Sequence, residues 1–245
     1  MNRTVMISGA SRGIGFAMAR RLLQDGHQVS LGVRDPDRFR QAQPELIGAG
    51  GGRLLLHHYE ACDPGSAADW VTATMRWRDD LSALIHCAGI LRRTALLFSD
   101  GEEADLDDLW RVNVMGPWWL TRAAWGPLSA SGEGRIQVLV SMSGKRSKGR
   151  MAGYPVSKFA LMALCQTMRN EGWDAGIRVT AFCPSWVNTD MASAISSVPP
   201  EAMTQPQDIA ELSSTLLQLP NASIPFELML NCNLCLLYTS DAADE

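Results

Sequence analysis

The sequence predicts an α/β fold, in which a parallel sheet of about seven strands is covered by helices on both faces. Two observations predict this fold. Short apolar runs alternate with helical patterns at intervals of about 30 residues, the spacing of successive strand–helix units. Glycine and proline stand at the ends of these segments, where the chain must turn. The predicted strands are Val5–Ile7, Val29–Val33, Leu54–His57, Ala83–His86, Ile136–Val140, Val179–Cys183 and Phe226–Leu230.

The predicted helices between these strands carry their own end signals. The first covers Ala17–Gln24 and is followed by Gly26, the residue type that ends helices in a left-handed conformation. Asp35 precedes Pro36, and this pair predicts the N-cap and first residue of the second helix. The last long helix covers Asp208–Leu219. The end signals and the apolar runs therefore agree on one order of elements.

The composition is that of a globular domain. The chain has 245 residues, of which 46% are hydrophobic and 20% charged, which is enough apolar surface to bury a core. Its net charge of −4 gives no general attraction to nucleic acids or anionic membranes. No apolar run approaches the roughly 20 residues of a membrane helix, and the N-terminal run is too short for a signal peptide. We expect a cytoplasmic protein with no nucleic-acid partner, no membrane partner and no metal.

A glycine-rich turn joins the first predicted strand to the first predicted helix. Its glycines have the spacing G-x3-G-x-G, which lets the chain turn tightly and approach a pyrophosphate closely. The amides at the start of the helix then face the phosphate charge. A purely structural turn is the alternative, but the position between strand and helix favours dinucleotide binding. The predicted cofactor contacts here are Gly9, Ser11, Arg12, Gly13, Ile14 and Gly15.

Tyr154 and Lys158 are four residues apart, so they are predicted to share one face of a helix. A phenol has a pKa of about 10 in water, and we expect the nearby ammonium to lower the pKa of Tyr154. Tyr154 can then protonate a carbonyl oxygen or deprotonate an alcohol. Ser141 ends a predicted strand, where open α/β sheets bind ligands, and its hydroxyl can hold the reacting oxygen. A strand-end hydroxyl without chemistry is the alternative for Ser141.

The order and spacing of these motifs resemble the short, single-domain branch of the short-chain dehydrogenase/reductase family, over about residues 3–232. The resemblance implies a Rossmann-type, doubly wound domain over residues 1–234 that binds NADP and carries the catalytic groups. It also implies that Lys158 binds the nicotinamide ribose and that Asn113 anchors a water linking Lys158 to solvent. The implied catalytic residues are Asn113, Ser141, Tyr154 and Lys158.

The same resemblance implies further contacts with the cofactor and shows where this chain departs from the family. His86 and Cys87 replace an asparagine pair, and we expect His86 to be buried and hydrogen-bonded rather than catalytic. Ser185 replaces a glycine, which demands an ordinary backbone angle there. Asp63 is expected against the adenine ring. The other implied cofactor contacts are Ala88, Gly89, Tyr154, Lys158, Pro184, Val187 and Thr189.

Arg12 and Arg34 predict a preference for NADP(H). Members of the resembled family that prefer NAD carry an acid at the end of the second strand, where this chain has Val33 followed by Arg34. Two guanidinium groups suit a 2′-phosphate, which arginine holds with paired hydrogen bonds. Asp35 is expected to be occupied as an N-cap. The alternative is that both arginines are merely solvated.

The expected function is NADPH-dependent reduction of a ketone or aldehyde, or the reverse alcohol dehydrogenation, with Tyr154 as the proton donor. The partner is then a small-molecule carbonyl or alcohol. A non-catalytic dinucleotide-binding sensor or scaffold is the alternative. The basic run over residues 145–150 either attracts an anionic substrate or is a solvated loop. The segment Met191–Met203 resembles the family's substrate loop and predicts an apolar lid.

Aromatic residues predict self-association. The predicted helix Asn113–Leu128 carries Trp118, Trp119 and Trp125, more large aromatics than one buried stripe needs. Such a surplus is typical of an interface, so we expect a homodimer or homotetramer; a wholly internal role is the alternative.

The last residues of the chain do not continue the strand–helix pattern. Residues 235–245 resemble the translation of a transposon sequencing adaptor. We expect this segment to be a non-native tail rather than part of the evolved protein.

Overall fold

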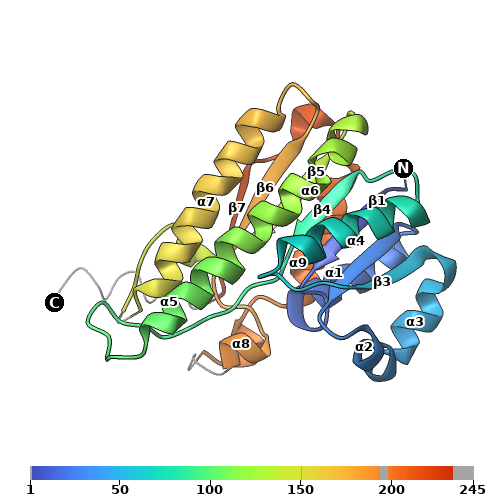
Figure 1. The fold of residues 1–245 in the computed structure, drawn as a ribbon. Coiled ribbons are helices and arrows are strands. Elements are labelled where there is room, and N and C mark those ends of the chain that lie inside the picture. Colours follow the sequence, from blue (N-terminus) through green and yellow to red (C-terminus); the bar gives the residue numbers. More distant parts are fainter. Residues whose placement is uncertain (1, 150, 194–197, 234–245) are drawn as a thin grey trace.

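The computed structural model describes residues 2–149, 151–193 and 198–233. Within them, parallel strands form one sheet in the order β3-β2-β1-β4-β5-β6-β7, which confirms the predicted Rossmann-type α/β fold (Figure 1). Each strand coincides with a predicted apolar run apart from small differences at its ends. The strands are β1 Thr4–Ser8, β2 Gln28–Val33, β3 Leu54–His58, β4 Ala83–His86, β5 Arg135–Leu139, β6 Arg178–Pro184 and β7 Glu227–Leu230.

The order of the strands reverses at the centre of the sheet. β1 pairs with β2 on one side and with β4 on the other, so that Met6 lies opposite both Ser30 and Leu84. From β1 the chain winds outward in one direction to β3, and then from β4 in the other direction to β7. In an open α/β sheet, ligands bind in the crevice at the carboxyl ends of the strands at such a point.

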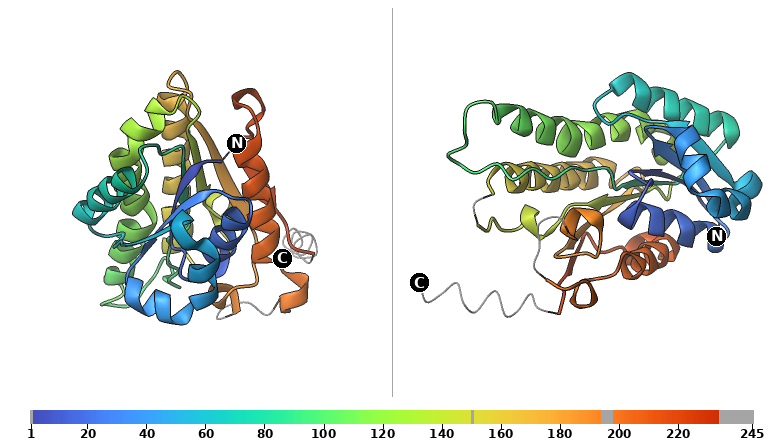
Figure 2. Two further views of the ribbon diagram at one scale, coloured as in Figure 1. Left: turned by 90° about the vertical axis from the view of Figure 1, so that its right-hand side faces the viewer. Right: turned by 90° about the horizontal axis from the view of Figure 1, so that it is seen from below.

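Helices cover both faces of the sheet, as Figure 2 shows. The helices α4, α6 and α7 lie on one face, while α1 and α9 pack against each other on the opposite face. The short α2 and α3 lie beside β3, and α8 lies near the carboxyl ends of the strands (Figure 1). The helices are α1 Gly13–Gln24, α2 Pro36–Ala42, α3 Pro44–Gly50, α4 Pro64–Trp77, α5 Glu103–Trp110, α6 Gly116–Ala130, α7 Gly153–Gly172, α8 Asp190–Ser193 and α9 Pro206–Gln218.

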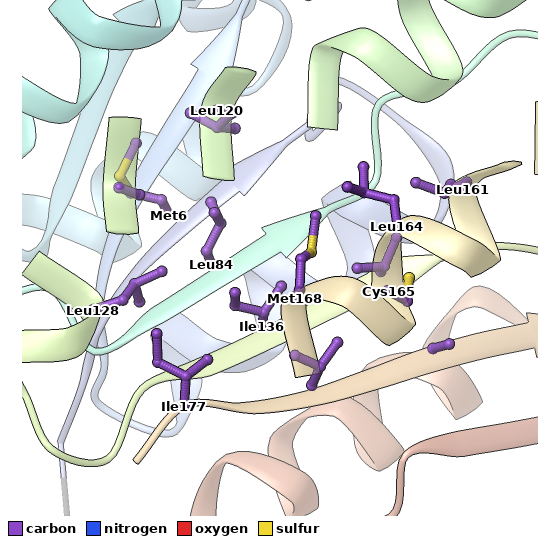
Figure 3. Packing of buried hydrophobic residues seen from close by; sticks show 14 of the residues in the cluster. Met6, Leu84, Leu120, Leu128, Ile136, Leu161, Leu164, Cys165, Met168 and Ile177 are labelled. Carbon is purple, nitrogen blue, oxygen red and sulfur yellow. The ribbon is translucent and has the colours of Figure 1, made fainter. Parts of the chain in front are cut away.

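The larger hydrophobic core lies between the sheet and the α4–α6–α7 layer. Met6, Leu84 and Ile136 point from adjacent strands toward Leu120 of α6 and Met168 of α7 (Figure 3). All five side chains are buried. Full burial of one such side chain stabilises the fold by about 1.5–3 kcal/mol, so this layer fixes the position of α7 on the sheet.

The second core lies on the other face and follows from strand alternation. Val5 and Ile7 flank Met6 in the sequence and point to the opposite side, where they pack with Met18 of α1 and Ile209 of α9. A sheet that is buried on both faces needs mostly apolar residues on both sides of its strands. This explains why the strands were visible in the sequence as continuous apolar runs.

The predicted helix-end signals are confirmed at two places. Gly26 has φ +90° just after α1, and the Asp35 side chain accepts a hydrogen bond from the Arg38 amide at 2.9 Å as the N-cap of α2. The prediction was less complete elsewhere. The helix α1 begins at Gly13, inside the glycine turn, and Pro44 begins a separate helix because its ring cannot continue α2.

The helix predicted over Asn113–Leu128 is the middle of a longer one. α5 passes through a π-helical segment, Arg111–Met115, directly into α6. Such π-helical turns are rare in proteins, and those that occur are often found at functional sites.

Some sequence-based expectations lie outside the described residues, namely the tail over residues 235–245, Arg150 of the basic run, and residues 194–197 of the Met191–Met203 segment. Among the helices of the described segments, none is long and apolar enough to cross a membrane.

Candidate active site

A cavity of about 990 Å³ runs along the carboxyl ends of the strands. It extends from Val33 and Arg34 at the end of β2, past the glycine turn, to Ser141 after β5 and Pro184 of β6. The predicted cofactor and catalytic residues that line it are Gly9, Ser11, Arg12, Gly13, Ile14, Gly15, Arg34, Ala88, Gly89, Ser141, Tyr154, Lys158, Pro184, Val187 and Thr189. The structure therefore brings together nearly all of the residues that the sequence indicated.

The glycine turn is shaped by two close backbone approaches. Gly9 has φ +70°, and a Cβ atom there would lie 2.5 Å from the Ala88 amide nitrogen. A Cβ atom on Gly15 would lie 2.5 Å from the Gly9 carbonyl oxygen. Neither position can accept a side chain without moving backbone. The turn is thus held against the loop after β4, with the N-terminus of α1 facing the cavity.

Ser141, Tyr154 and Lys158 meet at the other end of the cavity. Tyr154 and Lys158 lie on α7 and are only 7% and 5% exposed. The Lys158 Nζ lies 5.7 Å from the centre of the Tyr154 ring and donates a hydrogen bond to the Leu139 carbonyl oxygen at 3.0 Å. The Ser141 hydroxyl is close enough to the Tyr154 phenol to favour its ionised form. The predicted set is therefore assembled in one place.

Ser141 has a strained backbone. Its φ of 120° makes it the one residue other than glycine with a positive φ in the described parts of the chain. Its hydroxyl oxygen accepts a hydrogen bond from the Ser143 amide at 3.1 Å, in the short turn Met142–Gly144. Residues in such conformations cost of order 1–3 kcal/mol and cluster at functional sites. No pattern in the sequence indicates this strain.

Burial has the largest effect on the pKa values of Tyr154 and Lys158. It raises the pKa of Tyr154 to about 12, and the polar Ser141 side chain opposes this rise. Burial also lowers the pKa of Lys158 to about 8. The expectation that the ammonium would lower the pKa of Tyr154 is therefore wrong for the protein alone, because desolvation of the phenolate outweighs it. At neutral pH the phenol is protonated, which is the form that donates a proton.

Asn113 lies in the π-helical turn and is fully buried. Its side-chain oxygen accepts a hydrogen bond from the Ile90 amide at 2.9 Å, and its nitrogen donates to the Ile90 carbonyl at 3.0 Å and to the Ser157 hydroxyl at 3.1 Å. A Cβ atom on Gly89 would lie 3.3 Å from this Asn113 oxygen and 3.6 Å from the Lys158 Nζ. Asn113 therefore ties the loop after β4 to α7 beside Lys158.

His86 is a structural residue, as expected. It is 2% exposed, its Nε2 forms a hydrogen bond with the Thr121 hydroxyl at 2.9 Å, and it does not line the cavity. Burial lowers its pKa to about 3, so it is neutral under ordinary conditions. Ser185 has no positive φ, which matches the ordinary backbone angle expected at that position.

The end of the cavity beside Val33 and Arg34 has exposed basic groups. It is called the adenosine end, because the 2′-phosphate of the expected cofactor would lie there. Arg34 lines it, and the Arg34 carbonyl oxygen lies 2.8 Å from Nδ1 of His58, which holds the backbone in place. Asp35 does not line the cavity, because its carboxylate caps α2. Arg12 forms an exposed ion pair with Asp190 at 3.1 Å. Arg34 is therefore the better placed of the two predicted phosphate ligands.

Asp63 requires a correction. Its side chain caps α4 by accepting a hydrogen bond from the Gly65 amide at 2.8 Å, and it does not line the cavity. Glu60 and Ala61 line the cavity instead, following Tyr59, whose amide donates to the Val33 carbonyl at 2.9 Å. The sequence analysis missed Glu60 because Asp63, three positions later, matched the expected residue type.

Sequence reasoning also missed Arg93, which lines the cavity on the loop after β4. The basic run was only partly interpreted. Arg146 and Lys148 line the cavity, whereas Lys145 forms an ion pair with Glu227 at 3.0 Å outside it. Only the charge pattern signalled these residues, and a pattern does not show which charges are already paired.

A glycine turn before a helix that shares one cavity with Ser141 and the buried Tyr154 and Lys158 is typical of nucleotide-dependent oxidoreductases. Residues 3–199 match the family model described as short chain dehydrogenase, and the chain belongs to this family. Its similarity to an agropine synthesis reductase of Rhizobium rhizogenes is 33% identity over 217 residues, 89% of this chain and 49% of that protein. The chain thus spans about half the length of that relative.

Two solved structures are similar over nearly their whole length. One is an alcohol dehydrogenase from the archaeon Thermococcus sibiricus complexed with 5-hydroxy-NADP, with a TM-score of 0.81 and 29% identity, covering 94% of this chain and 96% of that one. The other is an actinorhodin polyketide ketoreductase variant with NADPH, with a TM-score of 0.83 and 25% identity, covering 96% and 97%.

Proposed function

We propose that the protein is an NADPH-dependent carbonyl reductase that can also run in reverse as an alcohol dehydrogenase, with Tyr154 as the proton donor. The observation that carries this proposal is the buried Tyr154 phenol, which lines the same cavity as Ser141, Lys158 and the glycine turn. The phenol is protonated at neutral pH, and Lys158 beside it would stabilise the phenolate that forms when the proton is transferred. The names of the relatives, which include reductases and alcohol dehydrogenases, support the same reaction class.

The residues present fit a nicotinamide dinucleotide. The glycine turn and the N-terminus of α1 line the cavity where a pyrophosphate would bind, and Arg34 stands at the adenosine end. When bound, the cofactor supplies the hydride that reduces the carbonyl carbon. The family is one that binds such cofactors, and the two solved structures with NADP-type ligands support the phosphorylated form.

Each side chain at the reacting end has a separate task in this proposal. The Ser141 hydroxyl holds the carbonyl oxygen beside the Tyr154 phenol, which gives it a proton. Lys158, with a pKa of about 8, is mostly protonated at neutral pH and stabilises the phenolate that remains. Asn113 binds the loop that follows β4 and holds Gly89 of that loop beside the Lys158 ammonium group.

Self-association is part of the proposal, as a homodimer or homotetramer. Trp118 is 50% exposed on α6, while Val156 and Phe159 are exposed on α7. Trp119 and Trp125 are partly buried against the core, so the internal alternative holds for those two. Light scattering at micromolar concentration tests the proposal, and a monomeric mass would contradict it.

The experiment that tests the function is the oxidation of NADPH across a panel of ketones, aldehydes and quinones. We expect at least one class of carbonyl to be reduced at a rate far above the background without enzyme. A protein that binds NADPH tightly but consumes none with any substrate would instead support the alternative of a sensor or scaffold. The presence of Ser141, Tyr154 and Lys158 together in the cavity argues against that alternative, because a sensor needs no proton donor.

A further inference from the structure

The cationic residues of the cavity fall into separate groups. Arg12 and Arg34 stand with the glycine turn and β2, where the proposed cofactor phosphates lie, and Lys158 is buried beside Tyr154. The others come from segments at the reacting end. The cationic residues that line this end of the cavity are Arg93, Arg146 and Lys148.

Arg93 is held beside the start of α7. The carbonyl oxygen of the next residue, Thr94, accepts hydrogen bonds from the amides of Ala152 at 2.7 Å and Gly153 at 3.3 Å, immediately before Tyr154. The same loop is bound to Asn113 through both backbone groups of Ile90. Arg93 therefore belongs to a segment that is fixed against the residues carrying the proton donor.

Arg146 is held on the other side of the reacting groups. The Met142 carbonyl oxygen accepts hydrogen bonds from the amides of Lys145 at 3.0 Å and Arg146 at 3.1 Å, in the turn that directly follows Ser141. The two arginines thus reach the cavity from two segments, one next to Tyr154 and one next to Ser141. A substrate whose carbonyl oxygen is held by Ser141 and Tyr154 lies between these segments.

The charges of these two arginines are not neutralised by neighbouring acids. Among the described residues, Arg93 and Arg146 form no ion pair. Their sequence neighbours do: Arg92 pairs with Asp105 at 3.1 Å and Asp108 at 3.6 Å, and Lys145 pairs with Glu227. Neither Arg92 nor Lys145 lines the cavity. Arg92 and Lys145 are thus neutralised outside the cavity, whereas Arg93 and Arg146 line it and keep their charge unpaired among the described residues.

Acidic groups that line the cavity are placed elsewhere. In the described part of the chain they are Glu60, at the adenosine end, and Asp190, which already binds Arg12. The walls around the reacting end are otherwise largely apolar, with Ile90, Leu91 and Met151 among them. Apolar walls strengthen an interaction between an arginine and an anion because they exclude water.

We propose that the substrates are carbonyl compounds that also carry an acidic group, a carboxylate or a phosphate, bound by Arg93 and Arg146. This inference rests on the proposed function and names its substrate class. Charge-assisted hydrogen bonds from arginine to either oxyanion have the geometry and strength for this role. The acidic group also positions the carbonyl oxygen at Ser141 and Tyr154, so its binding increases the rate as well as the affinity.

Matched pairs of substrates test the proposal. The carboxylate arm compares oxo acids from pyruvate to 5-oxohexanoate with their methyl esters, and the phosphate arm compares dihydroxyacetone phosphate with dihydroxyacetone. We expect kcat/KM for the acid of at least one pair to exceed that of its neutral partner at least about tenfold, as one charge-assisted contact provides. The arm that shows this difference identifies the oxyanion. The preference falls as salt rises, because ions screen the partly exposed arginines.

Four variants localise the effect. R93Q and R146Q each lower kcat/KM for the acid at least about tenfold and change that for the neutral partner less than about twofold. The controls R92Q and K145Q remove the same type of charge outside the cavity and leave both substrates unchanged. Calorimetric titration of the acid into the NADP-bound protein shows the same loss of affinity in R93Q and R146Q.

The outcomes separate this proposal from the proposed function. If the neutral partners are reduced as fast as the acids, or if R93Q and R146Q behave like the controls, the arginine site is contradicted while the reductase stands. If no carbonyl of either kind is reduced with NADPH, the proposed function fails and the substrate class fails with it.

Discussion

The two ends of the cavity are built differently. At the reacting end, Tyr154, Lys158 and Asn113 are buried, and the side chains of Lys158 and Asn113 form hydrogen bonds with other groups of the protein. At the adenosine end, backbone atoms of the glycine turn form the wall, and Arg34 is exposed. Burial shifts the pKa values of the groups that move the proton, whereas exposed charges select among cofactors. Changes at the first end should alter rate, and changes at the second end should alter cofactor affinity.

The largest expected effect is that of Tyr154→Phe, which removes the proton donor and keeps the ring in place. The rate of carbonyl reduction should fall at least about a hundredfold, the lower range for general-acid catalysis. The affinity for NADPH should change little because the glycine turn and Arg34 are untouched. Steady-state kinetics and a fluorescence titration with NADPH measure the two quantities. Equal losses in rate and affinity would break the distinction between the two ends.

Arg34→Asp should lower the affinity for NADPH and leave the rate of the reaction nearly unchanged. It replaces a group that holds the 2′-phosphate with one that repels it, so the KM for NADPH should rise at least about fiftyfold while kcat at saturation changes little. The KM for NADH should fall. Arg38→Asp makes the same change of charge on α2 outside the cavity and serves as the control. A wild-type protein that already prefers NADH would show that Arg34 does not select the cofactor.

The same contrast explains how far the sequence could predict the molecule. Strands that are buried on both faces read as apolar runs, and the glycine turn and Tyr154-x3-Lys158 are local patterns, so these were predicted correctly. The direction in which the pKa of Tyr154 shifts was predicted wrongly, because it depends on burial by residues that are distant in the sequence. Asp63 was assigned by residue type, but its position makes it a helix cap. Arg93 and the strain at Ser141 appear only once the loops are folded.

A smaller effect is expected on the free energy of unfolding, which should depend on pH through the buried His86. His86 has a pKa of about 3 when folded, against 6.5 for a free histidine, so the unfolded chain binds a proton more readily. Stability is therefore lost as pH falls below about 6.5, by roughly 1.4 kcal/mol at pH 5.5. His86→Asn should abolish that part of the slope between pH 7 and 5.5.

Chemical denaturation at several pH values measures this slope. His57→Asn is the matched control because His57 is partly exposed and bonds only the neighbouring carbonyl group. A His86→Asn protein with the same acid sensitivity as the wild type would show that His86 is not a source of that sensitivity.

The smallest expected effect is none at all. Deletion of residues 239–245 should leave the melting temperature and the NADPH-dependent activity unchanged, because we propose that residues 235–245 are not part of the evolved protein. Differential scanning calorimetry and the rate assay check this. A loss of folding or activity would make the segment an integral part of the protein.

The most direct test of the central claim is the stoichiometry of a single turnover. The wild-type protein and Tyr154→Phe are each loaded with one equivalent of NADPH and mixed with an excess of the best carbonyl substrate, and the alcohol is quantified by mass spectrometry. The wild-type protein should form one alcohol for each NADPH consumed, whereas Tyr154→Phe should bind NADPH equally well and form almost none over the same time. Alcohol formation by Tyr154→Phe at the wild-type rate would contradict the assignment of Tyr154 as the proton donor.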